Sequence, residues 1–154
     1  MTFVAKIEAR AYSRATELAE RVESAMLNLI PEEHRKDAEL EVTTVEGHSC
    51  DEIQIIIVRL NSETGCDDTL DHLFTSFDSR DRRRVHNSLL QRLNSNCLFF
   101  LRIDKQAAFL NKITLAEGPD VIHVRIDIKR HPKCRQEDAK TMLESRLQAA
   151  GGID

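Results

Sequence analysis

One candidate for chemistry is a group of four arginines at the start of a predicted helix: Arg80, Arg82, Arg83 and Arg84. Cations near a helix N-terminus oppose the helix dipole, and each costs a few tenths of a kcal/mol there. A bound anion would offset that cost, because helix N-termini and arginine forks both bind phosphate. The alternative is a solvated face whose arginines pair with Asp78, Asp81 and the acidic half of the chain.

A second group of cations lies on the polar faces of two predicted strands. Residues 3–12 and 121–129 both alternate between apolar and polar side chains, which is typical of half-buried strands. If the two strands are neighbours, one open sheet face carries Lys6, Arg10, Tyr12, Arg125 and Lys129. A basic sheet face is a common RNA platform, whereas an ordinary antiparallel sheet also has one solvated face. Aromatic residues are only 5% of the chain, which favours recognition of RNA shape or backbone.

The third group of cations follows a predicted buried strand at residues 97–103. Asp104-Lys105-Gln106 comes directly after this strand, and residues 104–111 fit either a helical turn or an irregular loop. A loop would present Lys105 and Gln106 to solvent. We predict one phosphate-binding patch that consists of Arg82, Arg83, Arg84, Arg102, Lys105 and Lys112. The strand cations extend this patch if the strand faces agree: Lys6, Arg10, Arg125 and Lys129.

Catalytic motifs and metal-ligand spacings do not occur in the sequence. It contains no G-x-x-x-x-G-K-[ST], G-x-S-x-G or H-E-x-x-H motif. His48 and Cys50 are separated by one residue, but no second pair has the spacing of zinc ligands. The four cysteines, at positions 50, 66, 97 and 134, form no C-x-x-C pair. We predict a protein without catalysis, cofactor or metal ion, and with four free thiols and no disulfide.

Composition and charge indicate one globular domain with an uneven surface. The chain has 154 residues, 41% apolar and 31% charged, which predicts a domain over residues 1–150 and a short tail at 151–154. No apolar run approaches the roughly 18 residues of a membrane helix, and charges near the N-terminus argue against a signal peptide. We therefore expect a cytoplasmic protein with no membrane partner. The net charge is −4, but residues 14–77 sum to −10 and residues 78–112 to +5.

The order of predicted elements indicates an α+β fold. Strands are predicted at 3–12, 39–46, 52–60, 97–103, 112–116 and 121–129, the last two forming a hairpin. Helices are predicted from a cap at Ser13 to Pro31, over 70–77, from Asp78 or Ser79 to about Leu93, and over 135–149. Because strands come in consecutive runs, we expect a mostly antiparallel sheet with helices packed on one face. Residues 3–12 and 120–130 are expected in the same sheet.

Three stretches of the chain resemble one archaeal protein family. They are KIEARAYSRATE near the N-terminus, VEGHSCDEIQII, and RIDKQAAFLNKITLAEGPDVIHVRI at residues 102–126. Together they span nearly the whole chain and are similar to the archaeal RNA-binding family described as predicted exosome subunits. The resemblance implies an α+β fold similar to the large-subunit ribosomal protein that binds 5S RNA. It also implies RNA as a partner, together with exosome or ribosome components.

The chain departs from the family pattern at two turns. Ser49-Cys50-Asp51 stands where the family often has Gly-Asn-Pro, and Asn111 stands where it often has Gly. Because Asn tolerates left-handed backbone angles, we expect the turn at Asn111 to be kept.

These observations predict a small RNA-binding module that binds phosphates through the basic patch and has no catalysis of its own. The alternative is a protein-interaction or assembly module, in which the acidic residues 14–77 dock a basic partner. Binding through phosphates falls steeply with salt, by about 0.7 logarithmic units per phosphate for single strands, so salt dependence separates the two hypotheses. The RNA target and the oligomeric state, including a homodimer, stay open.

Overall fold

A five-stranded sheet organises the chain, and its strands follow the order β2-β3-β1-β5-β4. The computed structural model describes residues 3–14, 17–46, 52–129 and 133–151. The strands are β1 (Val4–Ser13), β2 (Glu39–Glu46), β3 (Glu52–Leu60), β4 (Leu98–Asp104) and β5 (Val121–Ile128). Every pair of neighbouring strands is antiparallel. The pairing of β1 with β5 confirms the prediction that residues 3–12 and 120–130 share a sheet.

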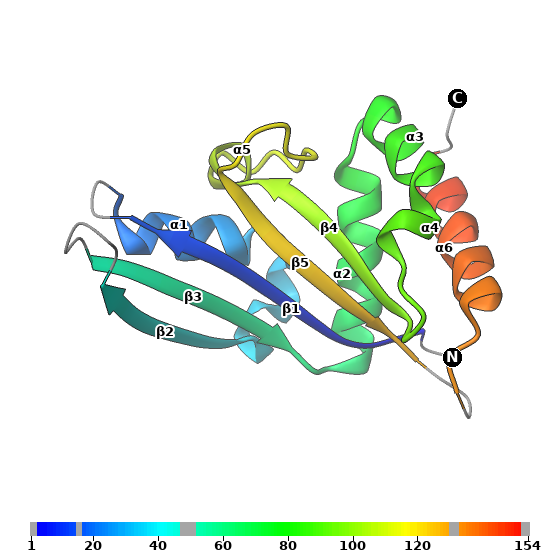
Figure 1. Cartoon of the computed structure of the whole chain (residues 1–154), viewed down its shortest axis with the longest axis horizontal. Coiled ribbons are helices and arrows are strands. Elements are labelled where there is room, and N and C mark those ends of the chain that lie inside the picture. Colours follow the sequence, from blue (N-terminus) through cyan, green and yellow to red (C-terminus); the bar gives the residue numbers. More distant parts are fainter. Residues whose placement is uncertain (1–2, 15–16, 47–51, 130–132, 152–154) are drawn as a thin grey trace.

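The helices gather on one side of this sheet and leave its other face open (Figure 1). They are α1 (Ala19–Leu27), α2 (Glu63–Ser76), α3 (Ser79–Asn87), α4 (Leu89–Arg92), α5 (Lys105–Phe109) and α6 (Gln136–Ala150). A 3-10 helix covers Glu32–Asp37. The α+β fold with an antiparallel sheet is therefore confirmed. None of the described helices combines the length and apolar character needed to cross a membrane.

The hydrophobic core lies between the sheet and the helices. On β5, the alternating residues Ile122, Val124 and Ile126 are buried, as their spacing predicts. Phe74 of α2 meets Phe99 of β4 edge to face, with ring centroids 6.3 Å apart. Alternation along the strands therefore fixes which side chains enter the core and which remain on the open face.

The start of the first helix differs from the prediction. Ser13 does not cap a helix, because β1 continues through Ser13 and the side chain is buried. The helix α1 begins at Ala19, after Leu18, whose side chain is 59% exposed. Pairing of β1 with β3, which continues to Ser13 opposite Gln54, extends the strand beyond the point where local capping signals suggested an end.

The predicted hairpin between residues 112–116 and the last strand is wrong. Both edges of β5 are already paired, one with β1 and the other with β4. Residues 112–116 instead meet the outer edge of β4, where Leu115 forms a bridge with Ile103. Residues 97–103 were expected to be a buried strand, but β4 is an edge strand with Phe100 41% exposed.

The turn after α5 keeps the expected backbone. Asn111 has a φ of 61°, in the left-handed region that Asn tolerates better than most residues. The other departure from the family pattern, Ser49-Cys50-Asp51, lies outside the described residues.

The prediction of four free thiols is wrong. Cys97 and Cys134 form a disulfide with 5.6 Å between their Cα atoms, which links the start of β4 to the segment before α6. The two residues are 37 positions apart in the sequence, and the pairing of β4 with β5 brings Cys97 against Ile128, shortly before Cys134. Cys66 is a buried free thiol, and its burial raises its pKa to about 11. Cys50 lies outside the described residues.

Candidate nucleic-acid interface

Rows of side chains cross the open face of the sheet in a register that the strand pairings define. Residues directly opposite each other on neighbouring strands share a face. One row contains Phe100, Arg125, Glu8 and Arg59, from β4 to β3. The next row contains Arg102, His123, Arg10 and Ile57. Tyr12 lies two residues further along β1.

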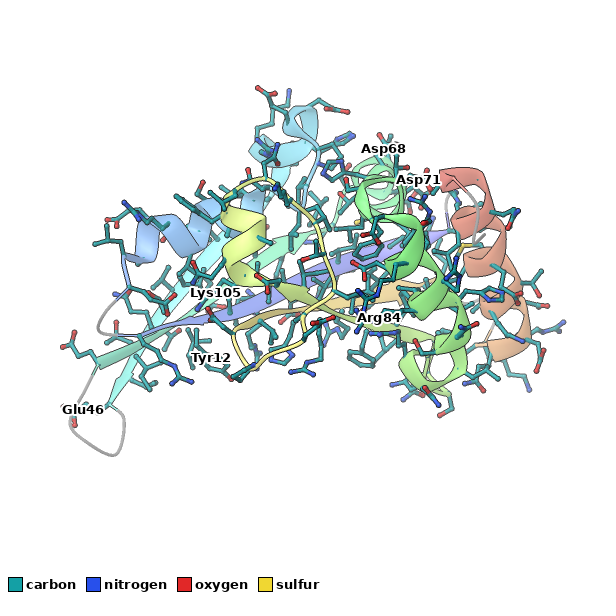
Figure 2. All side chains as sticks on the ribbon, turned by 90° about the horizontal axis from the view of Figure 1, so that it is seen from above. Tyr12, Glu46, Asp68, Asp71, Arg84 and Lys105 are labelled. Carbon is teal, nitrogen blue, oxygen red and sulfur yellow. A yellow bond between two sulfur atoms is a disulfide. The ribbon has the colours of Figure 1, made fainter. Side chains whose placement is uncertain are left out.

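A shallow hollow of about 330 Å³ lies on the β1, β5 and β4 part of this face. Its lining combines cations with exposed rings: Arg10, Arg125, Tyr12, Phe100 and His123, together with Glu8 and Val124. Tyr12 and Phe100 are each 41% exposed. Figure 2 shows Tyr12 on the side of the sheet that faces away from Asp68 and Asp71 of α2. The hollow is therefore open to a ligand on the uncovered side of the molecule.

The arginines on this face differ in how fully they are paired with carboxylates. Arg125 lies 2.9 Å from Glu8 and 3.1 Å from Asp127, so both sides of its guanidinium are paired. Arg10 is 3.8 Å from the same Glu8, and half of its side chain is exposed. Arg102 makes no ion pair with any residue that the structure describes. Arg10 and Arg102 therefore keep capacity to bind an anion.

His123 lies between these two cations on β5. It is opposite Arg102 of β4 on one side and Arg10 of β1 on the other. Partial burial lowers the pKa of His123, and the charges of Arg102 and Arg10 lower it further. The imidazole is consequently neutral near pH 7, when no anion is bound.

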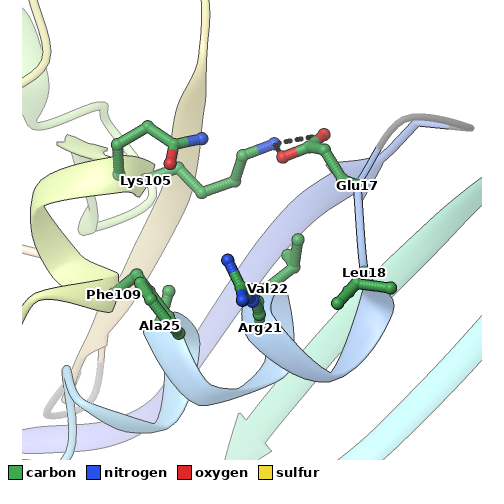
Figure 3. A pocket seen from close by; sticks show the side chains of 8 residues that line it. Glu17, Leu18, Arg21, Val22, Ala25, Lys105 and Phe109 are labelled. Carbon is green, nitrogen blue, oxygen red and sulfur yellow. Dashed lines mark hydrogen bonds and ion pairs between the residues drawn. The ribbon is translucent and has the colours of Figure 1, made fainter.

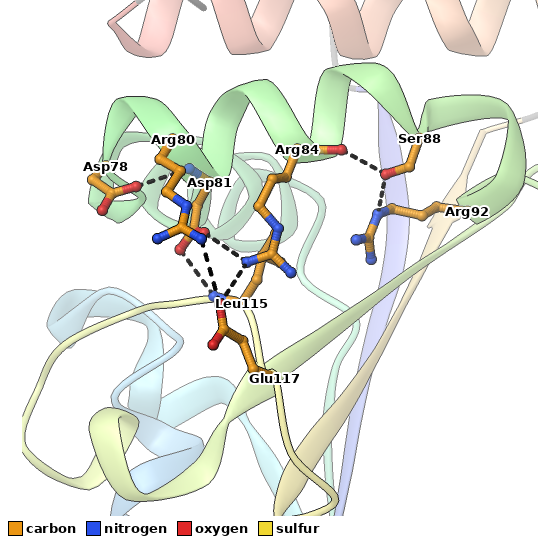
Figure 4. Close-up of polar contacts among 8 residues, drawn as sticks. All are labelled: Asp78, Arg80, Asp81, Arg84, Ser88, Arg92, Leu115 and Glu117. Carbon is orange, nitrogen blue, oxygen red and sulfur yellow. Dashed lines mark hydrogen bonds and ion pairs between the residues drawn. The ribbon is translucent and has the colours of Figure 1, made fainter.

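Further cations continue this surface around the outer edge of β4. Arg92 donates from Nε to Ser88 Oγ at 2.7 Å, and Ser88 Oγ donates to the carbonyl oxygen of Arg84 at 2.7 Å (Figure 4). Burial lowers the pKa of Arg92, and the charges of Arg84 and Arg102 add to that shift. The sequence reasoning missed Arg92, because it sits alone near the end of the predicted helix.

The arginine cluster on α3 is more strongly paired than the sequence suggested. Asp78 caps α3, and Arg84 lies 3.2 Å from the buried Asp81 and 3.6 Å from Glu117 (Figure 4). Arg80 lies 3.9 Å from the same Glu117. For Arg84 the structure therefore supports the alternative of pairing with Asp81.

Arg82 also has a structural role. Its Nη1 donates to the backbone carbonyls of Phe77 and Phe74, at the C-terminal end of α2. Its guanidinium lies close against Gly151, where an added Cβ would be 2.9 Å from Nη2. Arg83 is exposed. The structure thus separates the cluster into two pairs. Arg82 and Arg84 join elements of the fold, whereas Arg80 and Arg83 lie nearer to solvent.

Lys105 is not presented to solvent, and that prediction is wrong. The residue is 4% exposed, and its Nζ lies 2.9 Å from Glu17, 2.6 Å from Asp120 and 2.9 Å from the carbonyl oxygen of Tyr12. Figure 3 shows its ammonium paired with Glu17 above α1. Asp104 caps α5 by accepting from the N–H of Ala107, so of the two alternatives for residues 104–111 the chain forms the helix.

The carboxyl group of Asp120 responds to this lysine. Partial burial would raise the pKa of Asp120, but hydrogen bonds from Gln106 and Lys105, together with the charge of Lys105, outweigh burial. The pKa of Asp120 is therefore lowered. Lys105 and its partners tie the loop before β5 to the segment before α1, and this lysine has no donor left for phosphate.

The remaining predicted cations are dispersed. Lys6 is opposite Asp127 on the open face. Lys129 lies 2.9 Å from Glu63 at the start of α2, which directs it away from Arg10 and Arg102. Lys112 is exposed beyond α5. Of the ten predicted residues, the structure therefore brings Lys6, Arg10, Arg102 and Arg125 together on one face.

Many residues of the acidic half have partners within the fold. The buried Asp67 accepts hydrogen bonds from the backbone N–H groups of Phe3 and Val4. Asp71 lies 2.6 Å from Arg146 of α6. These contacts reduce the charge that the acidic half could offer to a basic partner.

One cluster has atoms of the kind that bind metals. Glu33, His34 and Asp68 place one potential ligand atom each within 4.8 Å of one another. His34 Nε2 already lies 2.7 Å from Asp68 Oδ2, so the ring and the carboxylate satisfy each other. We assign no metal to this exposed group.

These features define a class of protein: a small α+β domain whose helices cover one sheet face, while the other face is open and bears exposed rings beside arginines and carboxylates. Comparison with known proteins gives the family. Residues 6–128 match the family described as RNA binding, and the chain belongs to that family. It is 32% identical over 139 residues to an RNA-binding protein of Pyrococcus abyssi, and the match covers 90% of each chain.

Solved structures agree with the fold. A protein of Archaeoglobus fulgidus described as DUF54 superimposes with a TM-score of 0.77 at 22% identity, covering 93% of this chain and 99% of that one. A DUF54 protein from Methanothermobacter thermautotrophicus gives a TM-score of 0.75 at 24% identity, covering 94% and 98%. The family match and the relative from Pyrococcus abyssi confirm the resemblance to an archaeal RNA-binding family.

Proposed function

We propose that this protein binds RNA on the open face of its sheet and has no catalysis of its own. The observation that carries the proposal is the pair of exposed arginines, Arg10 and Arg102, on either side of His123 in one row of that face. Family membership supports RNA as the ligand. Arg92 of α4, which lies near enough to Arg102 to feel its charge, continues the cationic surface around the edge of β4, so the phosphates of one strand can follow it from the sheet face toward α4.

Association with other components remains a prediction from sequence resemblance alone. We propose exosome or ribosome components as partners, in the cytoplasm, on that ground. A homodimer is compatible with this proposal, and light scattering of the purified protein distinguishes it from a monomer.

The double variant Arg10→Ala plus Arg102→Ala is expected to weaken RNA binding about tenfold or more. Because two phosphate contacts are removed, the slope of log affinity against log salt should become shallower by about one to two units. Both side chains lie on the open face, so the fold should be unchanged. Titration of a labelled RNA at two salt concentrations measures both effects.

A matched control removes the same charge elsewhere. Lys36→Ala plus Arg135→Ala changes two exposed cations outside the open face, one on the 3-10 helix and one before α6. This control should keep wild-type affinity and slope. If both double variants lose affinity equally, the open face has no special role and the proposal is wrong.

Protonation of His123 should strengthen RNA binding in acid. Burial and the charges of Arg102 and Arg10 lower the pKa of His123 in the free protein. A phosphate placed beside the ring would raise that pKa, because its negative charge stabilises the imidazolium. Binding would then take up a proton, so affinity should rise as the pH falls from about 7.5 to about 5.5. His123→Gln should reduce this rise. An identical pH profile for wild type and His123→Gln would show that no phosphate lies beside the ring.

A further inference from the structure

Three ring-bearing side chains lie on one diagonal of the open face. Phe100 is on β4, His123 on β5 and Tyr12 on β1. The pairing of Arg102 with His123, and of His123 with Arg10, places each ring one strand across and two residues along from the previous one. Diagonal neighbours on antiparallel strands lie about 7–8 Å apart. The rings therefore form a regular line across the face.

All three rings are accessible to a ligand. Tyr12 and Phe100 are each 41% exposed, and His123 is exposed as well. They line the same hollow of about 330 Å³. None of them belongs to the hydrophobic core, which takes the opposite face of the same strands.

Cations flank this line of rings on both sides. Arg102 is next to His123 toward the outer edge of β4, and Arg10 is next to it on β1. Arg125 lies between Phe100 and Glu8 in the adjacent row. A chain with flat bases and a phosphate at each residue matches rings in a line with cations beside them.

We propose that this diagonal binds a single-stranded segment of RNA, with three successive bases stacked on Phe100, His123 and Tyr12. The inference rests on the proposed function and adds the class of RNA. In an RNA duplex the bases are stacked on one another inside the helix, so rings on a protein surface cannot reach their faces. Unpaired bases present those faces, and every base can stack on an aromatic ring.

The sequence supplies a direct spectroscopic test. Tyr12 is the single tyrosine of the chain, and there is no tryptophan, so the intrinsic fluorescence reports the environment of this one ring. Titration with an unlabelled single-stranded oligoadenylate about 12 nucleotides long should quench it, because a base stacks on the ring. A duplex of the same length should leave it unchanged. Bound single strand without quenching would overturn stacking on Tyr12.

Removal of Phe100 tests the other end of the line. Phe100→Ala should weaken binding of the single strand about tenfold, with less effect on the duplex. The salt slope should stay the same, because no phosphate contact is removed. Phe109→Ala is the matched control, since Phe109 is 36% exposed but lies beside Arg21 in a pocket between α1 and α5, outside the open face.

The outcomes separate this inference from the proposed function. If Phe100→Ala and Phe109→Ala bind single-stranded RNA like wild type while Arg10→Ala plus Arg102→Ala binds weakly, RNA uses this face without stacking and the inference falls alone. Equal losses for single strand and duplex in Phe100→Ala would overturn it too. If the arginine variant also binds like wild type, the proposed function and the inference fail together.

Discussion

Replacement of Lys105 by methionine is expected to lower the free energy of unfolding by about 3 kcal/mol. Methionine fills a similar volume but leaves the carboxylates of Glu17 and Asp120 and the carbonyl of Tyr12 without the ammonium that now joins them. Part of this loss is recovered by water, because about half of the Asp120 side chain is exposed. Urea denaturation measures the change.

The same variant separates structure from RNA binding. At a temperature where Lys105→Met is folded, the variant should bind RNA like wild type. In the wild-type protein the ammonium of Lys105 has no donor left for phosphate, so its removal takes away no RNA contact. Lys112→Met, at an exposed position beyond α5, should keep wild-type stability. If Lys105→Met has normal stability but binds RNA weakly, Lys105 contacts phosphate, as the sequence suggested.

Replacement of Asp81 by alanine is expected to cost about 2 kcal/mol of stability. Asp81 is 6% exposed, accepts from the N–H of Leu115 at 3.1 Å and lies 3.2 Å from Arg84. The variant leaves that N–H without its acceptor and leaves Arg84 with only the longer contact to Glu117. It would therefore loosen the segment that covers the edge of β4.

A milder variant controls for this interpretation. Asp81→Asn keeps an oxygen that accepts from Leu115 while it removes the charge beside Arg84, so its loss should be about half as large. Thermal or urea unfolding of both variants gives the comparison. Equal stability of Asp81→Ala and wild type would mean that the segment at Leu115 is held by other contacts.

The alternation of apolar and polar residues in the sequence determined which side chains of β1 and β5 lie on the open face. Lys6, Arg10 and Tyr12 share a face of β1 because successive side chains of a strand point to opposite sides, and that is a local property of the backbone. The same rule predicts the exposed face of β5, including Arg125. It also applies to Phe100 on β4, whose alternation with the buried Phe99 could have revealed it as a surface ring.

Only the tertiary structure decided the contacts between distant segments. Lys105 reaches Glu17 because α5 packs against α1, and Cys97 reaches Cys134 because β4 pairs with β5. Neither contact follows from local sequence signals. The edge position of β4, which leaves Arg102 beside Arg92, likewise depends on which strands pair. Periodicity records the preferences of neighbouring residues, whereas ion pairs, disulfides and strand order depend on the free energy of the whole packed chain.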